Sequence, residues 1–114
     1  MLLPGLAKKV TIHLNDDTSS KNDFLSREIL SLLLREGVAG ATVVRPEAGF
    51  GTHQRLHALE GGLDTARHMP LRIEFIEAGK KVERLLPSLM ELVTDGLIEA
   101  HDTEVLKLAV GTAR

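Results

Sequence analysis

Residues 8–14 form the clearest alternating segment of the chain, because polar and apolar side chains alternate from Lys9 to Leu14. Such alternation predicts a strand with one buried face. Its inward side chains are Val10, Ile12 and Leu14, and its outward ones are Lys9, Thr11 and His13. Residues 71–77 repeat the pattern, with Leu71, Ile73 and Phe75 inward and Arg72, Glu74 and Ile76 outward. The sequence therefore predicts two half-buried strands.

Residues 24–36 contain neither glycine nor proline and predict a helix that ends at Gly37, where glycine suits a C-terminal cap. The polar residues 15–22 before it predict a loop, and Ser20 or Asp23 is the candidate N-terminal cap. The apolar surface of this helix is wide, which favours broad packing on a sheet over a contact between subunits.

Residues 80–95 predict a second helix, because their apolar side chains recur at helical spacing. The apolar set is Val82, Leu85, Leu86, Leu89, Met90 and Val93. Gly96 is expected to stop this helix. Pro87 conflicts with a helix interior, where proline costs about 3 kcal/mol or more. The sequence therefore predicts either a kink at Pro87 or a separate first turn.

Residues 40–47 are rich in β-forming side chains and predict a strand that stops at Pro46, because proline cannot donate to a strand ladder. Residues 48–69 then predict a long polar loop, within which residues 56–63 favour a short helical turn. A loop of this length in a compact domain indicates either a function or a missed element.

The last part of the chain predicts two short strands, at residues 97–100 and 104–108, separated by a turn at His101–Thr103. The tail from Gly111 is expected to fray. The predicted order is then β-α-β-β-α-β, which is the α+β ferredoxin-like arrangement of a four-stranded antiparallel sheet with two helices on one face. Residues 1–114 are expected to form one such domain. The outward side chains of Val44 and Ile76 predict that oligomer contacts cover part of the other face.

Composition narrows the classes of function. The formal net charge is −2 with acids and bases interspersed, so nothing predicts binding to nucleic acid or an anionic membrane. No segment predicts a signal peptide or a membrane span, which favours a cytoplasmic protein without membrane insertion. The chain has no cysteine, and its serines form no nucleophile motif. The carboxylate pairs Asp16/Asp17 and Glu74/Glu77 have no predicted catalytic placement, so no enzymatic activity is predicted.

The candidate ligand site lies around the end of the second predicted strand. Gly49 and Gly51 allow a ligand to approach the main chain, and Phe50 between them could cover a ligand ring. The alternative is a strand-ending bulge with Phe50 packed inward. Arg45, Arg55 and Arg67 flank or lie in the long loop and could bind phosphates or carboxylates; otherwise they are solvated or form ion pairs between subunits.

Three histidines of the loop, His53, His57 and His68, form a weaker candidate set for a metal. His53 and His57 are four residues apart, a spacing that brings side chains together on a helix. A metal site needs three or four ligands, and no carboxylate pattern completes this one. Copies of one histidine around a symmetry axis are the way such a site could be completed.

The segment from Gly37 to Gly51, which reads GVAGATVVRPEAGFG, and the following Arg55-Leu56-His57 resemble domain of unknown function 190, a PII-like family of small bacterial proteins. The resemblance extends from Val10 to Leu108 and includes the Leu86-Pro87 break. It implies a ferredoxin-like fold assembled as a homotrimer. Part of the family is found beside or fused to fluoride-channel-type membrane proteins, which implies a membrane channel or transporter as the target protein.

A more distant resemblance is to the PII nitrogen-signalling proteins, in which a nucleotide binds between subunits. It implies that Gly40, Thr42, Gly49, Phe50, Gly51 and Gln54 contribute to such a site. The chain departs from PII proteins in two ways. Residues 94–98 read Thr-Asp-Gly-Leu-Ile, with Leu97 where PII proteins carry a phosphate-binding lysine, and the chain has no tyrosine for modification.

The leading hypothesis is a PII-like signalling protein that binds a small ligand, an adenine nucleotide or related anion, between subunits and regulates a partner through residues 48–69. Its ligand-binding residues are expected to be Thr42, Arg45, Gly49, Phe50, Gly51, Gln54, Arg55 and His57. The alternatives are a metal-responsive trimer that uses the loop histidines, and a structural adaptor without a small ligand.

Overall fold

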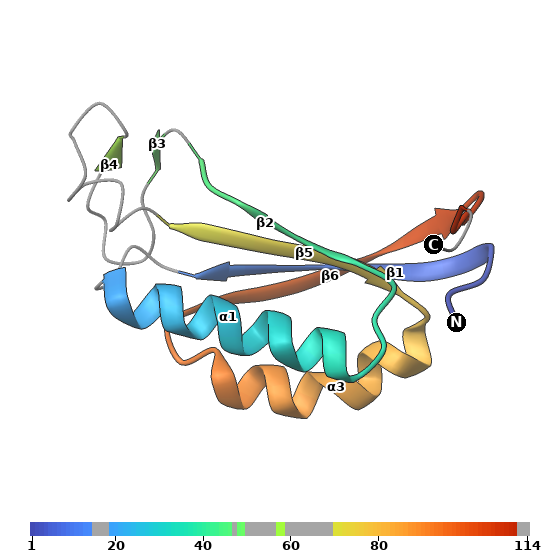
Figure 1. The fold of residues 1–114 in the computed structure, drawn as a ribbon, viewed down its shortest axis with the longest axis horizontal. Coiled ribbons are helices and arrows are strands. Elements are labelled where there is room, and N and C mark those ends of the chain that lie inside the picture. Colours follow the sequence, from blue (N-terminus) through green and yellow to red (C-terminus); the bar gives the residue numbers. More distant parts are fainter. Residues whose placement is uncertain (15–18, 47, 50–56, 59–69, 112–114) are drawn as a thin grey trace.

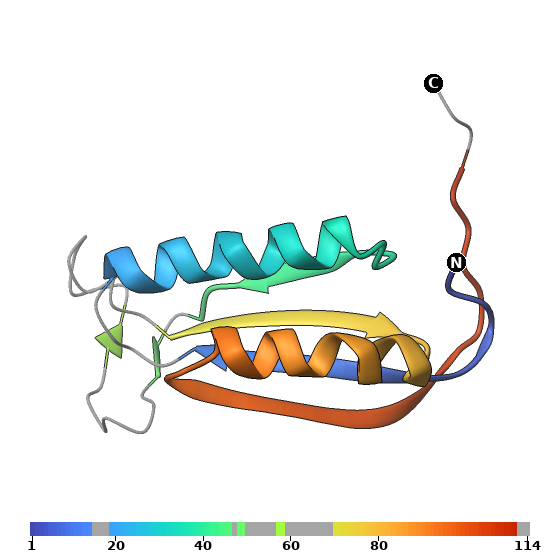
Figure 2. The same cartoon turned by 90° about the horizontal axis from the view of Figure 1, so that it is seen from below.

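The chain forms two layers, a four-stranded sheet and two helices that cover one of its faces (Figures 1 and 2). The computed structural model describes residues 1–14, 19–46, 48–49, 57–58 and 70–111. Its elements are, in chain order, β1 (Gly5–Leu14), α1 (Ser19–Arg35), β2 (Ala41–Val44), β3 (Ala48–Gly49), β4 (His57–Ala58), β5 (Leu71–Glu77), α3 (Gly79–Leu92) and β6 (Gly96–Val105).

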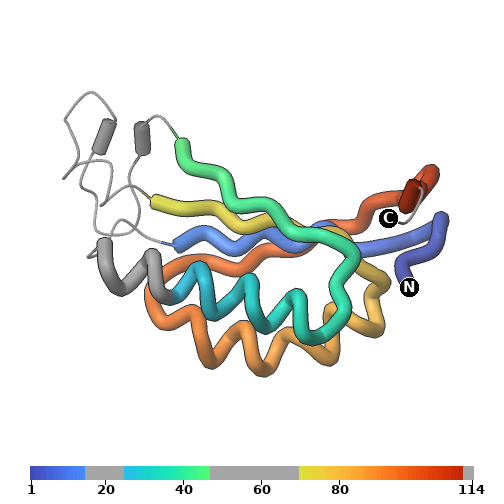
Figure 3. Tube along the Cα trace, in the orientation of Figure 1, coloured from blue at the N-terminus to red at the C-terminus, as the bar shows by residue number. Residues whose placement is uncertain are grey.

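The sheet has the order β2-β5-β1-β6, and every pairing is antiparallel. Ile12 of β1 lies opposite Ile73 of β5 and Ile98 of β6, which fixes the register across the centre. This arrangement confirms the predicted α+β ferredoxin-like fold. The longest strands, β1 and β6, extend together past the ends of the helices, near both termini (Figure 3).

The core lies between the sheet and the two helices. The inward side chains predicted for the two alternating segments are all buried there, and Ile29, Leu33 and Leu89 pack on them from the helices. The outward side chains of the same strands lie on the other face, here called the open face, which no described element covers. Alternation therefore predicted correctly which face of each strand is buried.

Helix α1 begins at Ser19, earlier than the sequence predicted. The predicted loop is therefore wrong for residues 19–22, and Ser20 and Asp23 lie inside the helix rather than at its cap. The predicted end is confirmed, because Gly37 has a φ of 77° and its N–H donates to the Leu34 carbonyl at 3.1 Å. This glycine geometry lets the chain turn away from the helix toward β2.

Helix α3 is continuous from Gly79 to Leu92 and contains Pro87, so the predicted separate first turn is wrong. Its buried side chains are Val82, Leu85 and Leu89, whereas Met90 is 62% exposed. Met90 was predicted to be on the buried face. Met90 is exposed because the part of α3 that contacts the sheet is narrower than the full set of apolar residues in its sequence.

Pro87 provides a prediction about stability. Replacing this exposed residue with alanine should raise the free energy of unfolding by about 1–2 kcal/mol. A helix-interior N–H regains its bond and the ring no longer clashes with the preceding turn, and this gain exceeds the loss caused by a freer unfolded chain. Urea unfolding of the Pro87→Ala and Ser88→Ala variants tests this, the second serving as the neighbouring exposed control. A loss of stability in Pro87→Ala would show that the proline is required for packing of the helix.

The predicted break between two C-terminal strands is wrong, because β6 is one continuous strand from Gly96 to Val105. Pairing with β1 along its whole length overrides the local turn signals. Asp102, predicted to be in the turn, lies opposite Lys8, and its carboxylate is 2.5 Å from the Lys8 ammonium. The hydrogen bond from Lys8 lowers the pKa of Asp102 below its usual value. This exposed pair is therefore fully formed at any pH above the usual carboxylate pKa, and it is lost as the pH falls through the lowered pKa.

Gly96 has a different role from the predicted one. Helix α3 ends at Leu92, with Val93 as its cap, and Gly96 is the first residue of β6. It lies opposite Leu14, and a Cβ at this position would be 2.1 Å from the His13 carbonyl oxygen. The glycine is therefore required by the close approach of two backbones rather than by the helix end.

The region predicted as one long loop contains a short ladder. Ala48 and Gly49 of β3 pair antiparallel with Ala58 and His57 of β4. The predicted loop is therefore wrong at these positions, and the helical turn predicted for residues 56–63 is wrong at 57–58. Strand β2 ends at Val44, before Pro46, as proline chemistry predicted.

Candidate functional site

A hollow of about 360 Å³ lies beside the first residues of β2. Its apolar walls include Leu2, Ile76 and Leu108, and its polar side chains are Lys9, Thr42 and Glu74. The sheet register brings these polar residues together, because Thr42 lies opposite Glu74 and Lys9 lies opposite Ile76. Residues from β1, β2, β5 and both terminal segments therefore meet at one place on the open face.

The charges of this hollow are already partly paired. The Lys9 ammonium is 3.4 Å from one Glu74 carboxylate oxygen, and the Arg72 guanidinium is 2.7 Å from the other. Since Glu74 is shared by two cations, the three side chains of Lys9, Arg72 and Glu74 together carry a net positive charge. The Thr42 hydroxyl beside it can both donate and accept a hydrogen bond. The hollow thus combines apolar walls with a cation, a hydroxyl and a carboxylate, as small-molecule sites do.

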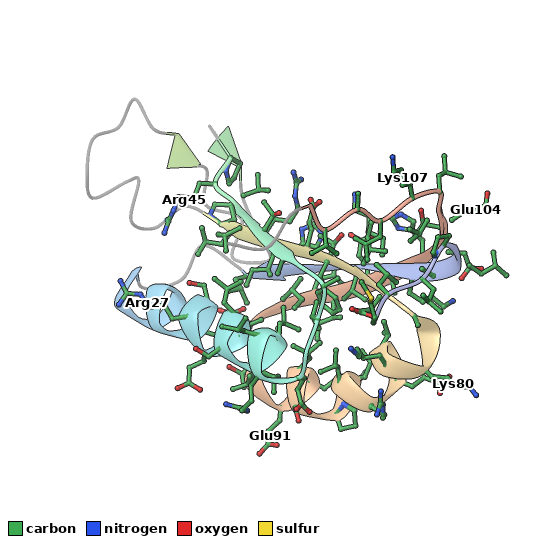
Figure 4. The ribbon with its side chains drawn as sticks, turned by 45° about the vertical axis from the view of Figure 1, so that its right-hand side comes forward. Arg27, Arg45, Lys80, Glu91, Glu104 and Lys107 are labelled. Atoms are coloured by element: carbon green, nitrogen blue, oxygen red, sulfur yellow. The ribbon has the colours of Figure 1, made fainter. Side chains whose placement is uncertain are left out.

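Two further predicted residues lie side by side at the other end of β2. Gly49 and His57 are directly opposite each other in the β3–β4 ladder. Arg45 follows the last residue of β2 and projects at the same end of the molecule as this ladder (Figure 4). It is exposed and takes part in an interaction within the chain.

The predicted site therefore divides into two parts within one chain. Thr42 lines the hollow at the beginning of β2, whereas Arg45, Gly49 and His57 lie past its end. Phe50, Gly51, Gln54 and Arg55 are outside the described residues, as are Arg67 and the metal candidates His53 and His68. Over the parts of the chain that the structure describes, no group of three metal-ligating side chains occurs. The metal hypothesis stays an untested alternative.

The sequence reading missed Lys9 and Glu74 as site residues. A signal for them existed, because alternation placed both side chains outward, on the face that Thr42 shares. Combining these outward positions with the antiparallel registers of β1–β5 and β2–β5 would have placed Lys9 and Glu74 near Thr42. Leu2 and Leu108 carried no such signal, because each belongs to a terminal segment outside the sheet.

A larger hollow, about 760 Å³, lies between the outer surfaces of α1 and α3. Arg27, Ser31 and Arg35 line it from α1, and Ser88 and Glu91 line it from α3; Figure 4 shows Arg27 and Glu91 on these helices. It contains no residue of the predicted site. None of the helices in the described ranges is long and apolar enough to cross a bilayer.

The sheet order, the two helices and the antiparallel register define a ferredoxin-like α+β fold, which the chain shares with solved PII-like proteins. The chain belongs to the DUF190 family, described as "Uncharacterized ACR, COG1993", whose sequence model matches residues 7–105. This confirms the family resemblance found in the sequence. The UPF0166 protein MJ1524 of Methanocaldococcus jannaschii is 30% identical over 102 residues, which cover 89% of this chain and 93% of the relative.

Solved structures of similar fold include CPII, a nitrogen regulatory PII-like protein from Thiomonas intermedia K12. Its structure bound to ADP, AMP and bicarbonate is 22% identical to this chain, with a TM-score of 0.67 and 94% of each chain covered. Its structure bound to ADP and bicarbonate is 25% identical, with a TM-score of 0.59, and covers 94% of this chain and 95% of CPII. The likeness therefore extends over nearly the whole length of both proteins.

Proposed function

We propose that this chain is a non-catalytic PII-like regulatory protein of the cytoplasm that binds an adenine nucleotide between the subunits of a homotrimer. The observation that carries the proposal is the hollow beside Thr42, in a chain 25% identical to CPII, which was solved with ADP and bicarbonate. Thr42 was expected in a nucleotide site on sequence resemblance, and it lines a hollow of suitable chemistry.

The side chains of the hollow suit the parts of such a ligand. The apolar surfaces of Ile76 and Leu108 can contact the faces of a purine ring, and the Glu74 carboxylate and Thr42 hydroxyl can accept hydrogen bonds from its amino group. The Lys9 ammonium supplies a cation for a phosphate. Binding of phosphate by Lys9 would compete with its 3.4 Å pair with Glu74, so the pair must open or be shared.

A second subunit explains why the predicted residues divide into two groups. In a ring of identical subunits, the Thr42 hollow of one chain can face the Arg45 and Gly49 end of its neighbour. Each site would then be assembled from both ends of β2, one from each chain. Val44 and Ile76, which are half-buried on the open face, are the apolar positions expected to lie in these contacts.

The regulatory step is assigned to residues 48–69. A nucleotide bound beside Gly49 would favour one arrangement of this segment, provided that it binds that arrangement more tightly than the others. The favoured arrangement would then engage a target protein, and the family resemblance points to a membrane channel or transporter. Phe50, Gly51, Gln54, Arg55 and His57 are the residues expected to couple ligand and target.

Calorimetric titration of the purified protein with ADP, ATP and AMP tests the proposal. Wild type should bind at least one nucleotide, and Thr42→Ala should weaken that binding roughly fivefold, the effect of one lost hydrogen bond. Thr94→Ala, an exposed threonine after α3, is the matched control and should bind as wild type does. Flat titrations with all three nucleotides would refute nucleotide binding, and a monomer in sedimentation experiments would refute the shared site.

A further inference from the structure

Glu77 is an unusual residue for its position. The preceding inward residues of β5 are Leu71, Ile73 and Phe75, yet the last inward position carries a carboxylate that is only 1% exposed. Among the side chains whose burial the structure describes, it is the only buried acid or base. A buried carboxylate is costly unless hydrogen bonds compensate for the water it has lost. Its partners should therefore explain why an acid is present here.

Both carboxylate oxygens of Glu77 accept backbone hydrogen bonds. One oxygen accepts the N–H of Ala39 at 2.9 Å, across the structure, and the other accepts the N–H of Ala78 at 3.2 Å, at the beginning of α3. The Lys81 ammonium lies 3.9 Å from the first oxygen and donates to the Gly37 carbonyl at 3.0 Å. The Glu77–Lys81 pair thus connects the beginning of α3 with the segment between α1 and β2.

The segment held in this way is residues 39–41. Pairing of β2 with β5 begins only at Ala41, so the Ala39 N–H is outside the sheet ladder and donates to the Glu77 carboxylate instead. Residues 39–41 form part of the wall of the Thr42 hollow and of an adjoining apolar hollow against α1. Ala39 also lines a third hollow beside the terminal segments. One hydrogen bond to the buried Glu77 carboxylate therefore holds the main chain that these hollows share.

We propose that Glu77 is a positioning residue for the ligand site: it never touches the ligand but sets the position of residues 39–41 and so of Thr42. This inference rests on the proposed function for its effect on a ligand. The competing explanation is that Glu77 serves only the beginning of α3, where a carboxylate is favourable near the helix N-terminus. The two explanations differ in what a substitution does at Ala39, which lies on the far side of the contact.

Glu77→Gln is the sharpest substitution, because it keeps the shape but leaves one oxygen to serve two backbone donors. Glu83→Gln is the matched control, since Glu83 is an exposed acid on α3, the helix that follows Glu77. Ile73→Val is a second control that loosens the core without touching the contact. Where Glu77→Gln does not fold, Lys81→Met replaces it, because this variant removes the bond to Gly37 and leaves the carboxylate in place.

Two measurements on each variant decide the matter: amide hydrogen exchange of residues 39–41 without ligand, and calorimetric titration with ADP. Glu77→Gln should accelerate exchange at Ala39 roughly tenfold and weaken ADP binding roughly fivefold, a coupling of ordinary size, while both controls match wild type. Unchanged exchange at Ala39, or faster exchange with unaltered ADP affinity, overturns the inference. Where wild type binds ATP or AMP instead of ADP, that nucleotide is used for the titration. If wild type binds none of the three, the proposed function fails, and exchange alone decides whether Glu77 holds the segment.

Discussion

Replacing Leu89 with alanine is expected to lower the free energy of unfolding by about 3–5 kcal/mol, the usual range for a fully buried leucine whose removal leaves a cavity. Leu89 is 0% exposed and packs from α3 onto the inward side chains of β1 and β5. Neighbouring core groups come from a sheet held by three ladders, so they can collapse little into the space. A domain of this size has a total stability of about 5–15 kcal/mol, so the loss is a large share of it.

Met90→Ala is the matched control for this experiment. Met90 is the next residue of the same helix but is 62% exposed, so its truncation should change stability by no more than about 0.5 kcal/mol. Urea unfolding followed by circular dichroism measures both variants. Similar losses for the two would show that α3 is rotated relative to the sheet, and the assignment of its buried face would then be wrong.

The central strands were the easiest part of the fold to predict. β1 and β5 each have two neighbours in the sheet and one face on the helices. The inward positions of both strands must therefore be apolar, and this regular spacing can be seen in the sequence of each strand alone. The end of α1 at Gly37 was equally easy to predict, because a positive φ favours glycine, which has no Cβ to clash with the backbone.

The edge strand β6 was harder to predict, because it lacks the two neighbours and the buried face that shape the sequences of β1 and β5. β6 has a neighbour only on the β1 side, and most of its side chains are exposed. Without a buried face its sequence need not alternate, and His101 and Asp102 look like a turn. What makes them a strand is pairing with Lys9 and Lys8, more than ninety positions earlier in the chain. A local pattern does not contain that partner.

The candidate site was predictable only where a motif carried it. Thr42 was identified by resemblance and lines a hollow, but Lys9 and Glu74 needed the register of three strands before they formed a group with it. Glu77 illustrates the limit more clearly. From the sequence it read as half of an unplaced carboxylate pair, and only the contact with Ala39 gives it a role.

Replacing Gly96 with alanine is expected to destabilise the domain by about 3 kcal/mol, although the change adds only one methyl group. The new Cβ would lie 2.1 Å from the His13 carbonyl oxygen and 3.3 Å from the Leu14 Cα. Both are backbone atoms of a central strand, so no side-chain rotation can relieve the clash. The start of β6 must move instead, at the upper end of the cost of overpacking.

The movement should be local at first and visible in particular pairs. Gly96 lies opposite Leu14 and Leu97 opposite His13, so these two pairings should be lost before those further along β6. The His13 imidazole, 2.6 Å from the Glu99 carboxylate, would lose its partner if the shift extends that far. Amide hydrogen exchange should therefore accelerate most at residues 96–99.

Gly40→Ala is the control that separates this effect from the general cost of replacing glycine. A Cβ at Gly40 meets nothing within 4 Å, and its φ is not among the positive ones. Its stability should stay within about 0.5 kcal/mol of wild type in urea unfolding. Equal stability of the two variants would mean that β6 does not approach β1 closely at Gly96, and the register of that end of the sheet would then need to be shifted.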